Sequence, residues 1–387
     1  MAKNEQPQDY EQFRGTGSID LSQDPISLTA ALVDIYSESH QEQVIADTLE
    51  PALRDIPGVE VQRRGNTLVA RTDRGLGDRV ILAGHIDTVP PAENLPSRIG
   101  PDPETGEETL FGLGSVDMKS GAACYMHAFA TLAQSADLQR DLTLVLYEGE
   151  EVDTKYNGLH HLVQSDPELL EGSVALLGEP SNAQIEAGCQ GTLRLKVTAF
   201  GQRAHSARSW LGENALHKLA RVITRVADYE AQNVEIDGLT YREGLNFVIA
   251  ESGVATNTIP DEAWGFVNFR FAPNRAVEQA LTHTYDVLGI GTPENPHEGF
   301  TLEIDDTASG ALPGLDQPVT QRLVEATGGN VHPKFGWTDV ACFTQLGIPA
   351  VNFGAGNPGL AHTREERCPV QQITTVSEQL HKFLTSK

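Results

Sequence analysis

Short apolar runs, each separated from the next by a longer segment, recur along this chain. Strands of a parallel sheet read as short apolar runs because helices cover both of their faces. The runs occupy residues 80–83, 142–147, 174–177 and 350–353. Residues 24–53 and 118–134 instead have the composition and spacing of helices. The pattern predicts an α/β fold with a mostly parallel central sheet and helices on both faces.

A different periodicity marks the middle of the chain. Apolar and polar residues alternate around Leu195 and again around Phe269, which predicts strands with one solvated face. A helix predicted between them has apolar residues at Leu216, Leu219, Ile223 and Val226. A chain of 387 residues exceeds the size at which one core usually splits. We expect a larger domain of residues 1–189 and 308–387, interrupted by an α+β domain of residues 190–307.

Charge and composition narrow the classes of partner. The chain has 54 acidic and 28 basic residues, a formal net charge of −26, so nucleic acid and anionic membranes would repel it. No apolar run approaches the length of about 20 residues that spans a bilayer, and the first twenty residues are polar. Four scattered cysteines without a C-x-x-C pair indicate reduced thiols. We expect a cytoplasmic protein with small-molecule partners or a second copy of itself.

Carboxylates and imidazoles follow several of the predicted strands. His85 and Asp87 come directly after the run at 80–83, at the carboxyl end where ligands bind in open α/β sheets. Asp87 is placed to hold the second ring nitrogen of a ligating His85. The whole set is His85, Asp117, Glu150, Glu151, Glu179 and His362. Such a set can bind two divalent metals and leave one carboxylate as a base, which predicts a metal-dependent hydrolase.

Each of these residues also has an ordinary structural interpretation. Asp117 can cap the helix that follows it, and Glu150 and Glu151 can belong to a solvated charged loop. The segment 354–359 matches G-x-G-x-x-G after a strand and keeps a dinucleotide-binding oxidoreductase open as an alternative. That fingerprint requires a helix at the loop, which Pro358 argues against. A metal-binding protein without catalysis is a third possibility.

Taken in order, the motifs resemble those of the M20 co-catalytic metallopeptidases, a family that includes carboxypeptidases and amidohydrolases. The matching motifs are His-x-Asp, Asp-Met-Lys, Glu-Glu, Gly-Glu-Pro and a late His, spread over the chain from about residue 25. Within the family, CQGTLRLKVTAFGQRAHSARSWLGENALHKL, YREGLNF, NFRFAPNR and FGWTDV are similar to the succinyl-diaminopimelate desuccinylases of actinobacteria. The resemblance implies a catalytic domain with two metals, an inserted dimerisation or lid domain, and hydrolysis of an N-acyl amino acid. Other M20 amidohydrolases, such as acetylornithine deacetylases or dipeptidases, remain alternatives.

The resemblance also implies a role for each site residue. Asp117 would bridge two Zn²⁺ ions, for which Co²⁺ could substitute. His85 and Glu179 would complete one metal site, and Glu151 and His362 the other. Asp87 would support His85, and Glu150 would be the general base.

Further implied roles belong to the inserted domain and a later loop. In a homodimer, His205 would reach the partner's site and stabilise the oxyanion. The implied substrate contacts are Asn257, Arg270, Gly336 and Thr338, with Asp339 in the same loop. Proteobacterial relatives have Arg-Arg-Gly where this chain has Cys189-Gln190-Gly191. The basis of acyl recognition therefore stays open.

Overall fold

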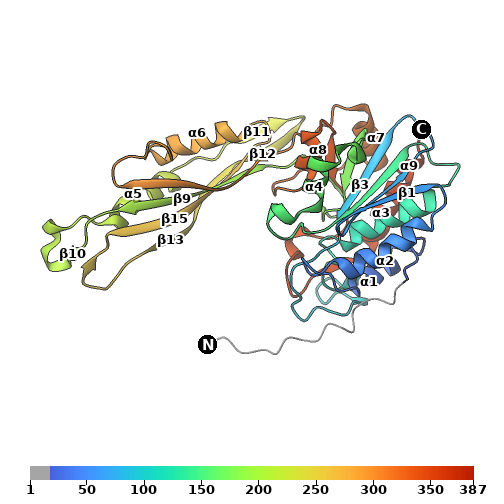
Figure 1. Ribbon diagram of the computed structural model, residues 1–387, viewed down its shortest axis with the longest axis horizontal. Helices are drawn as coiled ribbons and strands as arrows, with labels where there is room; N and C mark the ends of the chain where they lie inside the picture. Colours follow the sequence, from blue (N-terminus) through green and yellow to red (C-terminus); the bar gives the residue numbers. More distant parts are fainter. Residues whose placement is uncertain (1–17) are drawn as a thin grey trace. The chain divides into compact units, whose positions relative to one another are not determined.

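The computed structural model describes residues 18–387 and divides into two compact units (Figure 1). The polar residues 1–17, on which part of the expectation about targeting rests, lie outside this range. The first unit holds the chain up to Ala187 with Gly314–His332 and Cys342–Lys387, and the second holds Gly188–Pro313 with Pro333–Ala341. The second unit is larger than the expected 190–307. Backbone hydrogen bonds join Cys189 to Ala311 in both directions, each 3.0 Å long, and the Trp337 indole donates to the Ser309 carbonyl.

An eight-stranded sheet organises the first unit. Its order is β1-β2-β6-β3-β7-β18-β8-β17. The bounds are β1 Val59–Arg64, β2 Thr67–Thr72, β6 Asp141–Tyr147, β3 Arg79–His85, β7 Val174–Leu177, β18 Ala350–Asn352, β8 Ile185–Ala187 and β17 Val331–Pro333. The central strands β6, β3, β7 and β18 run parallel, whereas β1, β2 and β8 pair in antiparallel fashion. The α/β class with a mostly parallel centre is confirmed.

The predicted apolar runs are strands at the centre of this sheet. Every residue of β6 and β7 is buried, as expected for strands covered on both faces. The range 24–53, predicted to be helical, contains two helices, α1 Pro25–Val33 and α2 Gln43–Arg54, and the residues between them are not helical. Between them the chain is extended and pairs with the segment after β3. Ser39 N donates to the Thr88 carbonyl and Thr88 N to the Ser37 carbonyl, both at 3.0 Å.

Helices α3 Lys119–Leu132 and α9 Val370–Thr385 pack against each other and, through α3, against the sheet. The remaining helices partly or wholly in the first unit are α4 Gly158–Ser165, α7 Pro318–Ala326 and α8 Val340–Gln345. Gly121 lies in the first turn of α3, where a Cβ atom would be 1.9 Å from the Gly178 carbonyl oxygen. This glycine allows α3 to approach the end of β7 closely.

A small antiparallel sheet leads into the loop that carries Asp117. Its strands are β4 Arg98–Pro101, β5 Glu108–Phe111 and β19 Arg367–Pro369, in the order β19-β5-β4. Phe111, the last residue of β5, is opposite Arg367, the first residue of β19. The chain before β19 and the chain after β5 therefore leave this ladder at the same end.

The second unit is an α+β module. Its four-stranded sheet has the order β13-β15-β9-β16, with all pairings antiparallel. The elements are β9 Gly191–Phe200, β13 Gly244–Ser252, β15 Glu262–Phe271, β16 Phe300–Ala308, α5 Ala215–Ala227 and α6 Val277–Leu288. Two further two-stranded antiparallel sheets belong to this unit. One pairs β10 Ala204–His205 with β14 Thr258–Ile259, and the other is the hairpin of β11 Asn233–Ile236 and β12 Leu239–Arg242. The helix predicted around Leu219 is α5, but Leu216 is 42% exposed and Ala215 takes its expected place in the core.

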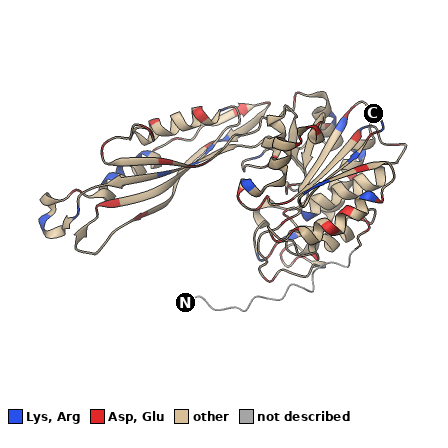
Figure 2. Ribbon diagram, in the orientation of Figure 1, with Lys and Arg blue, Asp and Glu red and all other residues tan. Residues whose placement is uncertain are grey.

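Charge is distributed over both units. Figure 2 shows Asp and Glu positions on helices and strands of each unit, in keeping with the excess of acidic residues. All four cysteines are buried free thiols. Within residues 18–387 no helix is both long enough and apolar enough to cross a membrane.

Candidate active site

Three neighbouring strands of the first unit end at one edge of the sheet, and each is followed by candidate site residues. His85 is the last residue of β3 and is paired with Tyr147, the last residue of β6. Glu150 and Glu151 lie in the turn after β6. Glu179 lies two residues after β7, whose last residue, Leu177, is paired with Ala83 of β3. Parallel pairing thus gathers residues that are far apart in sequence.

The His85 imidazole is buried between two carboxylates. Its Nε2 lies 3.1 Å from Asp117 Oδ1, and its Nδ1 lies 3.1 Å from the Asp87 carbonyl oxygen and 3.4 Å from Asp87 Oδ1. Burial disfavours a charged imidazole, but the hydrogen bonds to Asp117 and Asp87 outweigh it and raise the pKa of His85 well above its ordinary value. The field of Glu150 adds to this effect.

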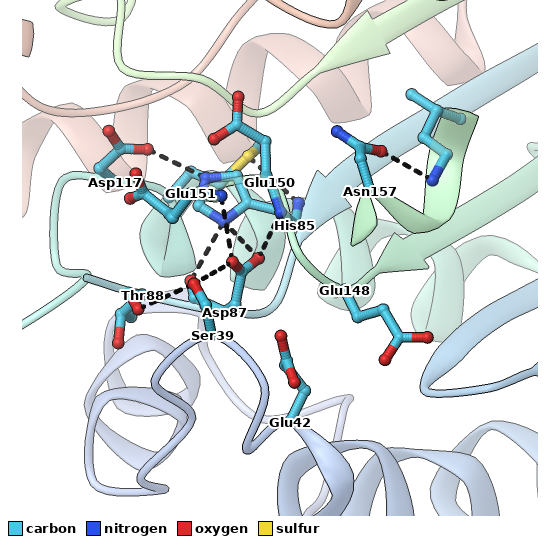
Figure 3. A network of polar contacts seen from close by, with 12 residues as sticks. Ser39, Glu42, His85, Asp87, Thr88, Asp117, Glu148, Glu150, Glu151 and Asn157 are labelled. Carbon is cyan, nitrogen blue, oxygen red and sulfur yellow. Dashed lines mark hydrogen bonds and ion pairs between the residues drawn. The ribbon is translucent and has the colours of Figure 1, made fainter. Parts of the chain in front are cut away.

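Asp87 also holds the turn that carries the two glutamates (Figure 3). Its Oδ1 accepts a hydrogen bond from Glu150 N, and its Oδ2 accepts one from Glu151 N, each at 3.1 Å. The Ser39 hydroxyl donates to Oδ2 at 2.7 Å. Burial of Asp87 opposes ionisation, yet its bonds to His85 and to these donors lower the pKa of the carboxyl below its ordinary value. One fully buried carboxylate therefore orients both His85 and the Glu150–Glu151 turn.

His362 approaches the same cluster from a distant part of the chain. Its Nε2 lies 2.9 Å from Glu151 Oε2 and 3.4 Å from Asp117 Oδ2. Hydrogen bonds to Asp117 and Glu151 raise the pKa of His362 to about 10, although partial burial opposes this. His362 itself has a φ of +59°, in the left-handed region. Two imidazoles and two carboxylates, from four separate segments, thus meet at one place.

This donor set fits divalent cations. Ligand atoms of His85, Asp117 and Glu151 lie within 4.8 Å of one another, and His362 contacts two of the three. The raised imidazole pKa values mean that the carboxylates favour positive charge at this position. A divalent cation can supply that charge in place of the ring protons. Imidazole nitrogen and carboxylate oxygen are also the donors of many catalytic zinc sites.

Glu179 and Glu150, the other two predicted site residues of the first unit, lie at the same edge of the sheet. Glu179 is 6% exposed and lies two residues after β7. Glu150 is half-buried beside Glu151, and its charge acts on His85. The roles of Glu179 as a ligand and of Glu150 as a base remain predictions.

In the second unit, His205 and Asn257 lie together at the two-stranded β10–β14 sheet. His205 is paired with Thr258, and Ser206 N donates to the Asn257 carbonyl at 2.9 Å. His205 is exposed, and its Nδ1 accepts a hydrogen bond from Ala207 N at 3.1 Å. Because Nδ1 accepts this bond, a neutral His205 ring carries its proton on Nε2.

Arg270 and Thr338 lie toward the other end of the same unit. Arg270 is paired with Thr192, close to Cys189, whose thiol contacts the Thr338 carbonyl at 3.7 Å. Burial lowers the pKa of the Arg270 guanidinium. Gly336 is exposed in the loop before Thr338.

The length of β15 separates these two groups of predicted residues. Glu262 and Arg270, at opposite ends of the strand, are eight residues apart, which at about 3.3 Å each corresponds to about 26 Å. The two-stranded β10–β14 sheet lies beyond the Glu262 end, at the tip of this unit in Figure 1. His205 and Arg270 of one chain are therefore too far apart to contact the same small molecule.

Cys189 and Gln190, where this chain departs from its proteobacterial relatives, lie inside the second unit. Both residues are buried, and the Gln190 amide donates to the Arg242 carbonyl at 2.6 Å. Gln190 therefore secures the end of β12 within the second unit.

The glycine-rich segment 354–359 does not have the geometry of a dinucleotide site. It leads into a single turn, Pro358–Leu360, and the next α-helix, α9, begins only at Val370. A Cβ on Gly354 would be 2.2 Å from the Gly178 carbonyl oxygen, so this glycine permits close packing beside Glu179. The oxidoreductase alternative loses its structural basis.

Two residues at the site were missed by sequence reasoning. Ser39 binds Asp87, and Glu366 accepts hydrogen bonds from the loop that carries Asp117. Burial raises the pKa of Glu366 to about 7, although these hydrogen bonds act against the increase. No local pattern indicates either contact, because the partners are 48 and about 250 positions away in sequence.

Comparison with known proteins agrees with this geometry. The model of peptidase family M20/M25/M40 matches residues 81–386. The chain is 56% identical to the succinyl-diaminopimelate desuccinylase of Corynebacterium glutamicum over 95% of this chain and 98% of that protein. It is 27% identical to the enzyme of the same name from Rhodospirillum rubrum, covering 93% and 97% of the two chains.

Solved structures share the fold. A tripeptidase from Staphylococcus aureus superposes with a TM-score of 0.75 at 21% identity, covering 94% of this chain and 98% of that one. A dinuclear metal-binding peptidase of Bacillus subtilis gives a TM-score of 0.64 at 14% identity, with 93% and 96% covered. The family match spans most of the chain and includes the ends of β3, β6 and β7, where the site residues lie. This protein belongs to peptidase family M20/M25/M40.

Proposed function

We propose that this protein is a cytoplasmic succinyl-diaminopimelate desuccinylase. It would hydrolyse N-succinyl-LL-2,6-diaminopimelate to succinate and LL-2,6-diaminopimelate, a step of lysine and diaminopimelate biosynthesis. The observation that carries the proposal is 56% identity over nearly the full length to an enzyme of that name. The meeting of His85, Asp117, Glu151 and His362 supports a metal-dependent amide hydrolysis.

Two Zn²⁺ ions, with Co²⁺ as a substitute, would be held by residues at the sheet edge. Asp117 would contribute to both sites, since its two oxygens face His85 and His362 respectively. Glu179 would join His85, and Glu151 would join His362. Paired divalent cations polarise a carbonyl group and make water a stronger acid.

The chain itself supplies the proton transfer. Glu151 would bind metal, and Glu150 would be the general base, because a carboxylate that does not bind metal accepts a proton more readily. It would take a proton from the attacking water and pass it to the leaving amine. Asp87 would keep this base in place, since its carboxylate holds Glu150 N as well as His85.

Two copies of the chain would build each complete site. The substrate, about as long as four extended residues, spans about 14 Å, whereas β15 alone separates the His205 end of the second unit from Arg270 by about 26 Å. If both residues serve one substrate, they must come from different copies. A homodimer in which His205 and Asn257 act on the partner's site satisfies this requirement.

Arg270 is the proposed partner of a substrate carboxylate. Its planar guanidinium can form two parallel hydrogen bonds with such a group. Gly336 and Thr338, at the same end of the second unit, would contact the substrate beside it. Cys189 and Gln190 take no part, because they are buried in contacts with the chain itself.

Purified protein tests the activity directly. Zinc-loaded protein should hydrolyse N-succinyl-LL-2,6-diaminopimelate much faster than N-acetylornithine or dipeptides. Exhaustive chelation should abolish turnover, and added Zn²⁺ should restore it. Preference for acetylornithine or a dipeptide would reassign the substrate within the family. Full turnover by protein shown to be metal-free would refute the metal mechanism.

Hybrid dimers test the contribution of His205. His205→Ala and Glu150→Ala should each be nearly inactive. In a mixed dimer, the His205→Ala subunit keeps its own Glu150 and receives His205 from its partner, so one site of two is complete. Random exchange of equal amounts makes about half of the dimers mixed, and activity should reach about a quarter of wild type. No recovery after confirmed exchange would mean that His205 acts within its own chain or has no role.

A further inference from the structure

The loop 112–117, which presents Asp117, has no regular structure, so its backbone N–H groups need partners of another kind. Leu113 N donates to the Asn94 carbonyl, and Ser115 N donates to the Gly112 carbonyl within the loop. The other four donors share one acceptor residue, Glu366. They are Gly112, Gly114, Val116 and Asp117.

Three of these four bonds go to the carboxylate of Glu366. Oε1 accepts from Val116 N at 2.9 Å and from Asp117 N at 3.0 Å, and Oε2 accepts from Gly114 N at 2.9 Å. The fourth joins Gly112 N to the Glu366 carbonyl oxygen at 3.2 Å. Glu366 is 2% exposed, so water does not compete for these donors. The loop is thus folded around one buried side chain.

Glu366 also belongs to the segment that carries His362. It lies four residues after His362 and directly before β19, which pairs with β5 at the start of the Asp117 loop. Its backbone N donates to the Thr363 carbonyl, which ties it to the residue after His362. One residue therefore fixes two segments that are about 250 positions apart and that both contribute to the cation site.

We propose that Glu366 is a positioning residue that joins the Asp117 and His362 segments and preforms the site for divalent cations. This role of Glu366 rests on the proposed metal-dependent function, but it concerns binding of the cation and not the choice of substrate. A side chain that holds ligands from behind sets their geometry before any cation arrives. The metal-free protein should then already have the loop in its binding conformation.

Glu366→Gln tests this role, because it retains the shape and replaces one acceptor oxygen with a donor. The amide nitrogen would replace Oε2 and face Gly114 N–H, another donor, while the remaining oxygen would still accept from Val116 N and Asp117 N. We expect the affinity for Zn²⁺ to fall 10- to 100-fold, the usual effect of losing a residue that supports metal ligands. Glu365→Gln is the matched control, since Glu365 is the neighbouring residue and is exposed.

Competition with a chromogenic chelator measures Zn²⁺ affinity for wild type and both variants. A tenfold or greater loss in Glu366→Gln, with Glu365→Gln unchanged, supports the proposal. A smaller loss in Glu366→Gln overturns it, even if its melting temperature falls, because a purely structural residue would lower stability without changing affinity.

Hydrogen exchange of the wild type tests the same idea without a variant, in case Glu366→Gln does not fold. The amides of Gly114, Val116 and Asp117 should be protected at least tenfold in metal-free protein. Exchange at the rate of an unstructured chain, with protection only after Zn²⁺ is added, would overturn the proposal. Wild type that binds Zn²⁺ but does not hydrolyse N-succinyl-diaminopimelate would refute the proposed function and leave the role of Glu366 standing.

Discussion

Asp87→Asn should weaken both the stability of the first unit and its affinity for zinc. The carboxylate accepts three hydrogen bonds in a fully buried position, two at Oδ2 and one at Oδ1. The Asn side chain keeps more hydrogen bonds if its nitrogen replaces Oδ1 and its oxygen replaces Oδ2. The nitrogen then faces Glu150 N–H, which is left without an acceptor. A buried donor without an acceptor costs about 1–3 kcal/mol. The other two hydrogen bonds remain, but each loses about 1 kcal/mol because its acceptor is no longer charged.

Part of this loss is offset by relief of charge repulsion. Burial raises the pKa of Glu42, and the negative charge of Asp87 contributes to that increase. We therefore expect a net loss of about 3 kcal/mol in the free energy of unfolding. For a unit of this size, that loss lowers Tm by about 8 °C. Zinc affinity should fall 10- to 100-fold, because His85 loses the carboxylate charge beside its Nδ1 and keeps only the backbone carbonyl of residue 87 as an acceptor.

Ser39→Ala is the matched control for this prediction. It removes one of the same three hydrogen bonds and leaves the carboxylate in contact with His85 and the turn. Stability should fall by about 1–2 kcal/mol while zinc affinity stays near that of wild type. Thermal unfolding in chelator and zinc competition measure the two quantities separately. Equal zinc affinity in Asp87→Asn, Ser39→Ala and wild type would refute the role assigned to Asp87.

Three other predictions address the base, the substrate and the stability of the unit. Glu150→Gln should retain two metals while kcat falls about 10²- to 10⁴-fold, whereas Glu151→Gln should lose metal. Elemental analysis and initial rates measure the two effects, and the reverse result would exchange the roles of the two residues. Arg270→Lys should raise KM with the metal content unchanged, and an unaltered KM would exclude a bidentate substrate contact. Hydrogen bonds from Thr105 N, Glu104 N and Arg367 lower the pKa of Asp102 to about 2. Asp102→Asn should therefore lower the free energy of unfolding near pH 7. The difference from wild type, measured by urea unfolding, should shrink as the pH falls from about 4 toward 2. A difference independent of pH would show that ionisation of Asp102 contributes nothing.

The centre of the fold could be predicted from the sequence because burial on both faces leaves a strong local mark. Strands β3, β6 and β7 are continuous apolar runs, and they place His85, Glu151 and Glu179 at one edge. The break between α1 and α2 could not be predicted, since it depends on pairing with Thr88, about 50 positions away. The sequence also does not decide which residue of the first turn of α5 enters the core. Leu216 and Ala215 are both apolar, and it is Ala215 that lies in the core.

The site itself was only partly accessible from local patterns. His362 follows an ordinary loop, and its role was suggested by resemblance to a family and not by its surroundings in the sequence. Ser39 and Glu366 act through hydrogen bonds to distant segments, so no periodicity or spacing marks them. Such supporting residues become visible only when the backbone N–H groups of the ligand-bearing loops are traced to their acceptors.

The length of β15 has a consequence for how the protein behaves on dilution. If His205 and Arg270 serve one substrate, an isolated chain holds only part of each site, however well it is folded and loaded with metal. Turnover per chain would then fall once the concentration drops below the dissociation constant of the dimer. Cells could adjust the rate by changing expression, with flux rising more steeply than the amount of protein at low abundance.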